Sequence, residues 1–235
     1  MKVSIVIPAY NESAVIKGKM TSLDNWCRDN LDDYEIVIVN DGSVDNTWDI
    51  VKKELVCGHI IDAGYSDNRG KGGALKAGVS ASCGDIIVTT DCDLAYGCDV
   101  IKDALQIMEN DTGIKVLIGS RSKVKNGFDG YPFIRKVASK VYFKLLSTYS
   151  GLKVSDSQCG FKCYERETAK KLFSELESTG FAFDLEILLR AKNNKIDIHE
   201  MPVKIKNHGN SKINVFKETF RMLREASEIK RRLVK

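Results

Sequence analysis

The first half of the chain alternates short β-branched runs with helical patterns, and this order limits the folds that it can adopt. Strand-like runs lie at Val3–Ile7, Glu35–Val39, His59–Asp62, Asp85–Thr90 and Lys115–Ile118. Four helical patterns lie between them. The first begins at Asn11, the second covers Thr47–Leu55, the third follows the glycine-rich stretch 70–73, and the fourth covers Asp99–Glu109. Such an order predicts a mostly parallel sheet with helices on both faces. We therefore expect an α/β domain.

The second half is less regular. We expect helices near Ile134–Tyr149, Arg166–Glu177 and Asp184–Asn193, and a strand near Ile198–Ile205. The 235 residues, 43% of them apolar, are enough for one core, so one compact domain with a C-terminal extension is the simplest organisation. The seven cysteines form no Cys-x-x-Cys pair and lack clustered histidines, which is typical of a reducing compartment. No apolar run approaches the roughly 18 residues that span a bilayer. We expect a soluble or peripheral protein without a signal peptide.

Acidic residues follow the first two expected strands. Pro8, Tyr10 and Glu12 close the first strand, and Asp41 closes the second. Ligands of open α/β sheets bind outside the carboxyl ends of the strands. Tyr10 and Pro8 could therefore pack a nucleobase, while Glu12 and Asp41 accept hydrogen bonds from it or from the ribose. The alternative is a pair of ordinary strand exits with capped helices.

A third strand end carries two carboxylates. Asp91 and Asp93 follow the run Ile86–Val88 and stand two residues apart. Carboxylate oxygens are hard ligands, and a divalent cation held by two of them keeps positions open for diphosphate oxygens. A turn is the alternative interpretation of the same triplet.

The segment Arg69–Gly73 is rich in glycine and precedes a helical pattern. It lacks the Gly-Lys-Ser/Thr of a Walker loop and the spacing of a dinucleotide fingerprint. Backbone N–H groups and cations at a helix N-terminus suit a diphosphate. A helix entry that needs a positive φ explains the glycines equally well.

Several motifs together resemble those of family 2 glycosyltransferases with a GT-A fold. IPAYNE (7–12), DGSVD (41–45), GKGGAL (70–75) and DCD (91–93) occur in the order and spacing of that family. GSR (119–121), DSQCGFK (156–162) and FAFDLE (181–186) are similar to the dolichyl-phosphate glucosyltransferase and dolichol-phosphate mannosyltransferase branch. The resemblance covers about residues 3–212. It implies a Rossmann-like GT-A domain over residues 1–212.

The resemblance also implies a donor site for a nucleotide diphosphate sugar. Asp91 would contact the ribose or the donor sugar, and Asp93, with Asp91, would bind Mg²⁺ or Mn²⁺ at the diphosphate. The metal would neutralise charge on the departing nucleotide. Ala95 stands where many relatives carry a glutamine near the metal. The donor-binding residues implied are Pro8, Tyr10, Glu12, Asp41, Lys71, Asp91 and Lys212.

An acceptor site follows from the same resemblance. Arg121, Arg135 and Ser139 match positions that contact the phosphate of a polyprenyl phosphate. Such a phosphate is already anionic, so it needs positioning more than a general base. The implied catalytic residues are Asp93, Arg121 and Asp156, although Asp156 could instead orient Arg121 or Lys162. Asp184 and Glu186 either position the acceptor loop or cap a helix.

The C-terminal tail is basic and amphipathic. Residues 204–235 hold ten Lys/Arg against three Asp/Glu. On a helical wheel, 213–235 shows an apolar half and a basic half, as in helices that lie on anionic membrane surfaces. The alternative is a helix docked on the domain with its charged face in water. Nucleic-acid binding is disfavoured, because no aromatic platform accompanies the basic residues.

We therefore expect an inverting glycosyltransferase that moves a hexose to a polyprenyl or dolichyl phosphate at the cytoplasmic membrane face. UDP-glucose is the first expected donor, and GDP-mannose is the second. The alternatives are a family 2 transferase to a soluble glycan and a catalytically inactive nucleotide-sugar binding protein. A sugar-phosphate nucleotidyltransferase is disfavoured, because its glycine-rich entry belongs after the first strand, where this chain carries 8–12.

Overall fold

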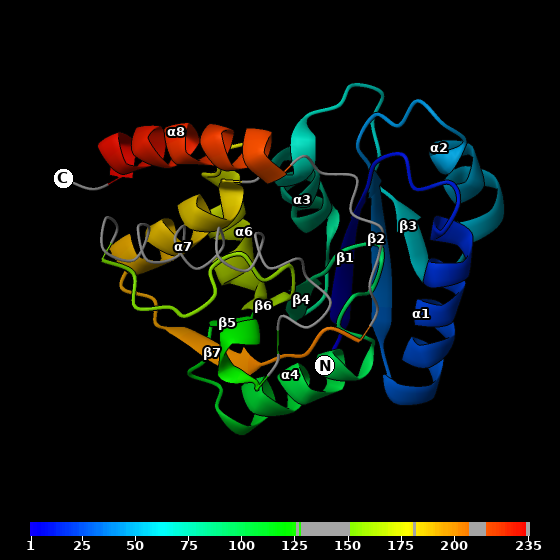
Figure 1. Ribbon diagram of the computed structural model, residues 1–235. Helices are drawn as coiled ribbons and strands as arrows, with labels where there is room; N and C mark the ends of the chain where they lie inside the picture. Colours follow the sequence, from blue (N-terminus) through cyan, green and yellow to red (C-terminus); the bar gives the residue numbers. More distant parts are fainter. Residues whose placement is uncertain (126, 128–150, 181, 207–214, 234–235) are drawn as a thin grey trace.

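The computed structural model describes residues 1–125, 127, 151–180, 182–206 and 215–233, and only the backbone of 215–223 (Figure 1). Its described strands form one sheet in the order β3-β2-β1-β4-β6-β5-β7. The strands are β1 Val3–Ala9, β2 Tyr34–Asn40, β3 Ile60–Asp62, β4 Ile86–Thr89, β5 Val116–Ser120, β6 Lys162–Glu165 and β7 Ile198–Pro202. The helices are α1 Ile16–Asn30, α2 Thr47–Ile50, the π-helix Val51–Leu55, α3 Gly70–Ala81, α4 Asp99–Asn110, the 3₁₀ turn Arg121–Lys123, α6 Arg166–Ser174, α7 Phe183–Asn193 and α8 Val215–Leu233. The predicted mostly parallel α/β architecture is confirmed.

Strand β6 is the main correction to the sequence-based expectation. It runs antiparallel to both β4 and β5 and separates them, with Val88 paired to Cys163 and Leu117 paired to the same residue. The stretch 156–164 was not expected to contain a strand, since Lys162–Glu165 is short and has a charged residue at each end. Pairing on both sides of β6, together with the burial of its first three residues, outweighs that weak local preference. The predicted helix near Ile134–Tyr149 lies outside the described residues.

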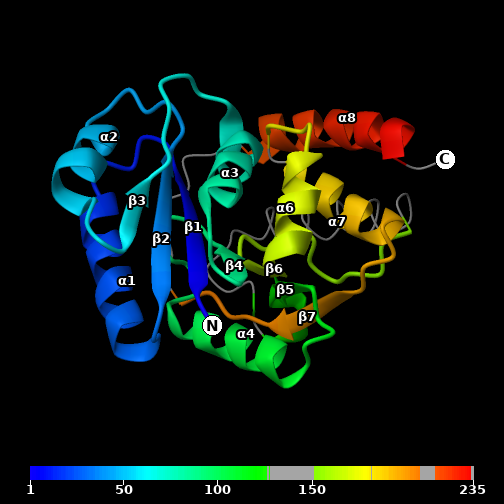
Figure 2. The same cartoon turned by 180° about the vertical axis from the view of Figure 1, so that it is seen from behind.

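Alternate side chains of the central strands pack into two layers of helices. Ile5, Ile7 and Val88 face the core beneath α1 and α4. Val6 and Ile87 face the opposite core, which α3, α6, α7 and the C-terminal part of α8 cover. Figures 1 and 2 show these two layers from opposite sides. Because both faces of the sheet are buried, the sequences of the central strands are continuous apolar runs.

The strand order reverses between β1 and β4. The chain passes from β1 outward to β2 and β3, and then returns through α3 to place β4 on the other side of β1. The carboxyl ends of β1, β2 and β4 therefore meet at a topological switch point, where open α/β sheets bind ligands. These are the ends that carry the acidic motifs.

Helix α8 lies along α7 (Figure 1). Its Ala226 and Ile229 are buried in the core that α7 also lines, so this part of the helix has the docked arrangement that was one of the two alternatives. Within the described residues, no helix combines the length and the apolar character needed to cross a membrane.

Candidate active site

Lys71 and Asp91 form an ion pair at the switch point. Lys71 lies in the first turn of α3, and its Nζ is 2.5 Å from Oδ1 of Asp91, just beyond β4. Burial alone would lower the pKa of Lys71, but the charges of Asp91 and Asp184 raise it. Burial would likewise raise the pKa of Asp91, and Lys71 lowers it instead. Asp91 is thus held as a carboxylate beside a fixed cation.

Asp93 has a different environment, although it stands only two residues away. Its Oδ1 accepts a hydrogen bond from the backbone N–H of Ala95 at 3.1 Å, and none of the described lysines or arginines forms an ion pair with it. Burial, with the neighbouring charge of Asp91, raises the pKa of Asp93. The charges of Lys71 and Lys19 oppose this effect only in part, so the negative charge of Asp93 is incompletely offset by the described basic side chains.

These properties fit a divalent cation. Asp91 and Asp93 supply hard oxygen ligands on one turn, and a cation would offset the repulsion between them. The described residues contain no group of three histidine, cysteine or acidic side chains arranged for a metal. Water or a diphosphate could supply further ligands to a cation held by Asp91 and Asp93.

Asp41 is fixed by the segment that precedes α3. Its Oδ1 accepts hydrogen bonds from Tyr65 Oη at 2.7 Å and from the backbone N–H of Arg69 at 2.8 Å. Gly42 adopts φ +64°, and a Cβ there would lie 2.4 Å from the backbone nitrogen of Asn68. The glycine thus permits the close approach of the chain's own loop 66–68. The Arg69 guanidinium also stacks over the Tyr65 ring, 4.3 Å from its centroid.

The end of β1 brings the other residues predicted to bind the nucleoside to the same edge. Tyr10 is 46% exposed directly after the strand, so its ring is available to a ligand. Pro8 is half-buried within the strand and pairs with Val39 of β2. The backbone N–H of Glu12 donates to Thr47 Oγ1, which ties this loop to the start of α2. The structure therefore brings Pro8, Tyr10, Glu12 and Asp41 to neighbouring strand ends.

Arg121 and Asp156 form a buried bidentate pair. Nε and Nη2 of Arg121 donate to the two carboxylate oxygens of Asp156 at 2.6 and 2.8 Å, and the Arg121 backbone N–H donates at 3.0 Å. Burial would lower the pKa of Arg121, but the hydrogen bonds with Asp156 raise it well above its usual value. Both oxygens of Asp156 are engaged, which matches the orienting role rather than that of a catalytic base.

Lys162 is the site residue that sequence reasoning left without a role of its own. It is 2% exposed on β6, and its Nζ lies 2.5 Å from Oδ1 of Asp184 and 2.5 Å from the carbonyl of Cys159. Burial raises the pKa of Asp184, and Lys162 opposes that effect. The positive charges of Lys162 and Arg121 also favour the ionised form of Asp91. A lysine flanked by the apolar residues 161 and 163 was the available signal.

The ion pairs Lys71–Asp91 and Lys162–Asp184 also interact with each other electrostatically, and their members come from α3, the segment after β4, β6 and α7. Gly160 lies against the first pair, since a Cβ there would be 2.2 Å from Oδ2 of Asp91. Three further predicted site residues, Arg135, Ser139 and Lys212, lie outside the described residues.

Comparison with known proteins identifies the family. The family described as Glycosyl transferase family 2 matches residues 4–173. The chain belongs to glycosyl transferase family 2. The predicted family is thereby confirmed, and the chain is a glycosyltransferase by membership.

The most similar proteins include enzymes named for dolichyl phosphate. The family 2 chain is 32% identical over 216 residues to UDP-N-acetylglucosamine–dolichyl-phosphate N-acetylglucosaminyltransferase of Methanococcus voltae, covering 85% of this chain and 84% of that protein. It is 31% identical to dolichyl-phosphate beta-glucosyltransferase of Dictyostelium discoideum, covering 97% and 73%. It is 27% identical to dolichol-phosphate mannosyltransferase of Pyrococcus furiosus, covering 98% and 66%.

Solved structures with the same fold include glucosyl-3-phosphoglycerate synthase of Mycobacterium tuberculosis. Its complex with phosphoglyceric acid has a TM-score of 0.73 and 20% identity, covering 99% of this chain and 80% of the synthase. The complex of that synthase with Mn²⁺, UDP and glucosyl-3-phosphoglycerate has a TM-score of 0.69 and 19% identity, covering 96% and 78%. At this identity the likeness concerns the fold alone, and it confirms the predicted GT-A fold.

Proposed function

We propose that this family 2 glycosyltransferase transfers a hexose, with inversion, from a nucleotide diphosphate sugar to a polyprenyl or dolichyl phosphate. The observation that carries the proposal is the Lys71–Asp91 pair beside Asp93 at the switch point of the sheet. Relatives named for dolichyl phosphate, matched over most of the chain, support the acceptor class. UDP-glucose is the proposed donor, with GDP-mannose second.

The donor half of the site lies at the ends of β1, β2 and β4. In this proposal Tyr10 and Pro8 pack the base, and Asp41 and Glu12 accept hydrogen bonds from the nucleoside. Asp41 is suited to this task, because Tyr65 and Arg69 fix the carboxylate before a ligand arrives. Lys71 would bind the diphosphate together with Lys212, which lies outside the described residues, and Asp91 would contact the ribose or the donor sugar.

Asp93, with Asp91, would hold Mg²⁺ or Mn²⁺. When bound, the ion would neutralise charge on the departing nucleotide diphosphate. The incompletely offset charge of Asp93 supports this assignment. Mn²⁺ accompanies UDP in the synthase complex of similar fold, which agrees with the same donor chemistry.

The acceptor phosphate would attack the anomeric carbon with one of its own anionic oxygens. The new carbon–oxygen bond forms as the bond to the diphosphate breaks, and the phosphate carries no proton that a base must remove. Arg121 would bind the acceptor phosphate together with Arg135 and Ser139. Asp156 would act through Arg121, since it holds the plane of the guanidinium by two hydrogen bonds.

We also propose a division of labour along the chain. Residues 1–212 form the catalytic domain, and 213–235 bring it to an anionic membrane surface on the cytoplasmic side. Exposed Arg224 and Arg231 on α8 support this, because they face water while Ala226 and Ile229 pack on the domain.

The decisive experiment incubates the purified chain with UDP-glucose, UDP-N-acetylglucosamine or GDP-mannose and a short-chain polyprenyl phosphate. Parallel samples contain Mg²⁺, Mn²⁺ or EDTA. We expect UDP-glucose to yield a phosphate-linked glycolipid, and we expect this transfer to require a divalent ion. Transfer to sugar hydroxyls with none to the lipid phosphate would support the soluble-glycan alternative and contradict the proposal. Absence of both transfer and donor hydrolysis would support an inactive binding protein. Calorimetry that detects binding of GDP but no binding of UDP would contradict the donor assignment.

A further inference from the structure

Glu186 is a buried carboxylate that the proposed chemistry does not use. It lies in the first turn of α7 and is fully buried. Its Oε1 and Oε2 accept hydrogen bonds from the backbone N–H groups of Glu177 and Ser178 at 3.1 and 2.9 Å. Both oxygens of the carboxylate therefore hold the backbone at Glu177 and Ser178, where the segment 177–180 begins.

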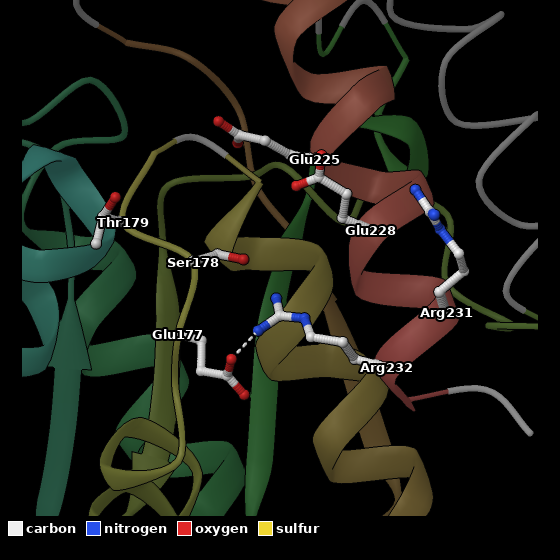
Figure 3. Close-up of a pocket in the computed structure, with 7 residues that line it drawn as sticks. All are labelled: Glu177, Ser178, Thr179, Glu225, Glu228, Arg231 and Arg232. Atoms are coloured by element: carbon white, nitrogen blue, oxygen red, sulfur yellow. Dashed lines mark hydrogen bonds and ion pairs between the residues drawn. The ribbon is translucent and has the colours of Figure 1, made fainter.

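Two arginines balance the charge of Glu186. Nε and Nη2 of Arg190, one turn along α7, donate to Oε1 at 2.9 and 2.7 Å. Nη2 of Arg232, on α8, lies 3.3 Å from Oε2. Arg232 also forms an ion pair with the Glu177 side chain, across a cleft between α8 and residues 177–179 (Figure 3). The carboxylate is thus held ionised in its buried position by two helices.

The segment 177–180 in turn packs on the first turn of α3. The carbonyl of Thr179 accepts a hydrogen bond from the backbone N–H of Gly72 at 2.8 Å. A Cβ on Gly70 would lie 2.6 Å from the Thr179 carbonyl oxygen, and a Cβ on Gly72 would lie 2.4 Å from that of Ser178. The glycines of this turn are therefore required by the neighbouring segment as well as by the helix entry.

Lys71 lies between these two glycines. Its Nζ is 5.9 Å from the centroid of the Phe183 ring, and Phe183 begins the same helix that carries Glu186. The same lysine reaches Asp91 at 2.5 Å. A continuous series of contacts therefore runs from Glu186, through the segment 177–180 and the first turn of α3, to the ion pair in the donor site.

We propose that Glu186 is a positioning residue for the donor site. By fixing the segment 177–180, it holds the first turn of α3 in the place where Lys71 meets Asp91. This inference rests on the proposed function only in taking Lys71 to act on a nucleotide diphosphate. It predicts that Glu186 controls donor affinity without touching the donor.

The test compares Glu186→Gln with the unchanged chain. Glutamine keeps the shape of the side chain, but it replaces one acceptor oxygen by an NH₂ group, so one of the two backbone N–H groups loses its partner. We expect the Kd for UDP and the donor KM to rise about fivefold or more, the lower end of typical coupling between sites. The acceptor KM should stay unchanged, and amide hydrogen exchange over 70–75 should become faster.

Glu165→Gln is the matched control. Glu165 also accepts two backbone N–H groups, those of Glu167 and Thr168, but it does so at the start of α6. Its replacement should lower thermal stability without changing UDP affinity or exchange over 70–75. If Glu186→Gln alters these two readouts no more than Glu165→Gln does, the proposal is wrong.

Gly72→Ala provides a second variant in case Glu186→Gln does not fold. The added methyl group presses on Ser178 from the opposite side, so the same rise in the Kd for UDP and the same faster exchange are expected. Unchanged values would contradict the proposal. Exchange over 70–75 needs no substrate, and it therefore tests the positioning role even if the unchanged chain fails to transfer sugar to a lipid phosphate.

Discussion

At the scale of single residues, the candidate active site is organised by how each carboxylate is partnered. Asp91 meets Lys71, Asp184 meets Lys162, and Asp156 meets Arg121. Asp93 differs, because among the described residues it has only a backbone hydrogen bond. Identical side chains on adjacent elements therefore have different tasks, and the tasks follow from partners that are distant in the sequence.

Replacing Lys71 by methionine should weaken donor use. The variant removes the cation that pairs with Asp91 and that also offsets part of the charge of Asp93. A hydrogen bond between charged groups contributes about 1.5 kcal/mol, so we expect kcat/KM for the donor to fall roughly tenfold. Steady-state kinetics at varied donor concentration measure this. Lys170→Met, which removes a surface hydrogen bond to Ser80, should leave kcat/KM unchanged, and an equal loss in both variants would speak against the assigned role.

Glu35 should make folding stability depend on pH. Burial would raise its pKa, but hydrogen bonds from Cys83 and Ser4 lower it to about 2, from a usual 4.5. A lowered pKa stabilises the folded state fully above about 4.5, and this contribution disappears as the pH falls toward 2. The stability difference between the unchanged chain and Glu35→Gln should therefore shrink over that window by on the order of 2 kcal/mol. Urea unfolding at several pH values measures the difference, and a constant difference would contradict this account.

At the scale of elements, α3 determines the geometry of the site, because it lies directly on β1 and β2. A Cβ on Gly78 would be 2.3 Å from Cγ1 of Val6 and 2.8 Å from Cγ2 of Val39. The absence of a side chain at this position lets the helix approach the sheet closely. The first turn of α3, with Lys71, is then near the carboxyl end of β4.

Gly78→Ala should therefore destabilise the chain by about 1–3 kcal/mol, since the extra methyl group overpacks the core. Gly18→Ala is the matched control on α1. A Cβ at Gly18 meets nothing within 4 Å, so alanine should stabilise by about 0.5–1 kcal/mol through its helix propensity. Thermal unfolding of both variants checks the prediction, and effects of the same sign would contradict it.

At the scale of the whole molecule, α8 packs on the proposed catalytic domain. Ala226 and Ile229 pack on α7, and Arg232 pairs with Glu177 and Glu186. Exposed Arg224 and Arg231 lie outside these contacts. Deleting residues 213–235 would uncover apolar surface, so substitution of exposed charges is the sharper test of membrane binding.

The double variant Arg224→Gln with Arg231→Gln should bind anionic vesicles more weakly. Each basic residue near such a surface contributes about 1 kcal/mol, so we expect a loss of roughly thirtyfold in the partition coefficient. Sedimentation with phosphatidylserine vesicles measures it. UDP affinity should be unchanged, and unchanged sedimentation would exclude this face of α8 as the membrane contact.

Much of the fold was predictable, because its signals are local. Runs such as Val3–Ile7 and Glu35–Val39 have apolar residues suited to both faces of a buried sheet, and the glycines at 70 and 72 mark the start of α3. Strand β6 was not predicted, since Lys162–Glu165 has a weak local preference and is stabilised by β4 and β5 on either side. The proximity of Asp41 to Tyr65 could not be predicted from the sequence either, because it depends on how a loop returns over β2.

By itself, the sequence determined the fold class, the family and the strand ends that carry acidic side chains, because these depend on residue type and spacing within one segment. Only the tertiary structure decided which charges compensate each other. Lys71 with Asp91, Lys162 with Asp184, and Arg121 with Asp156 come from different elements, and their pairing depends on the order of strands in the sheet. The position of Glu186 beneath the segment that holds α3 has the same origin. Electrostatic interactions depend on distances in space, so the charge pairs can be assigned only when the structure shows which distant segments pack together.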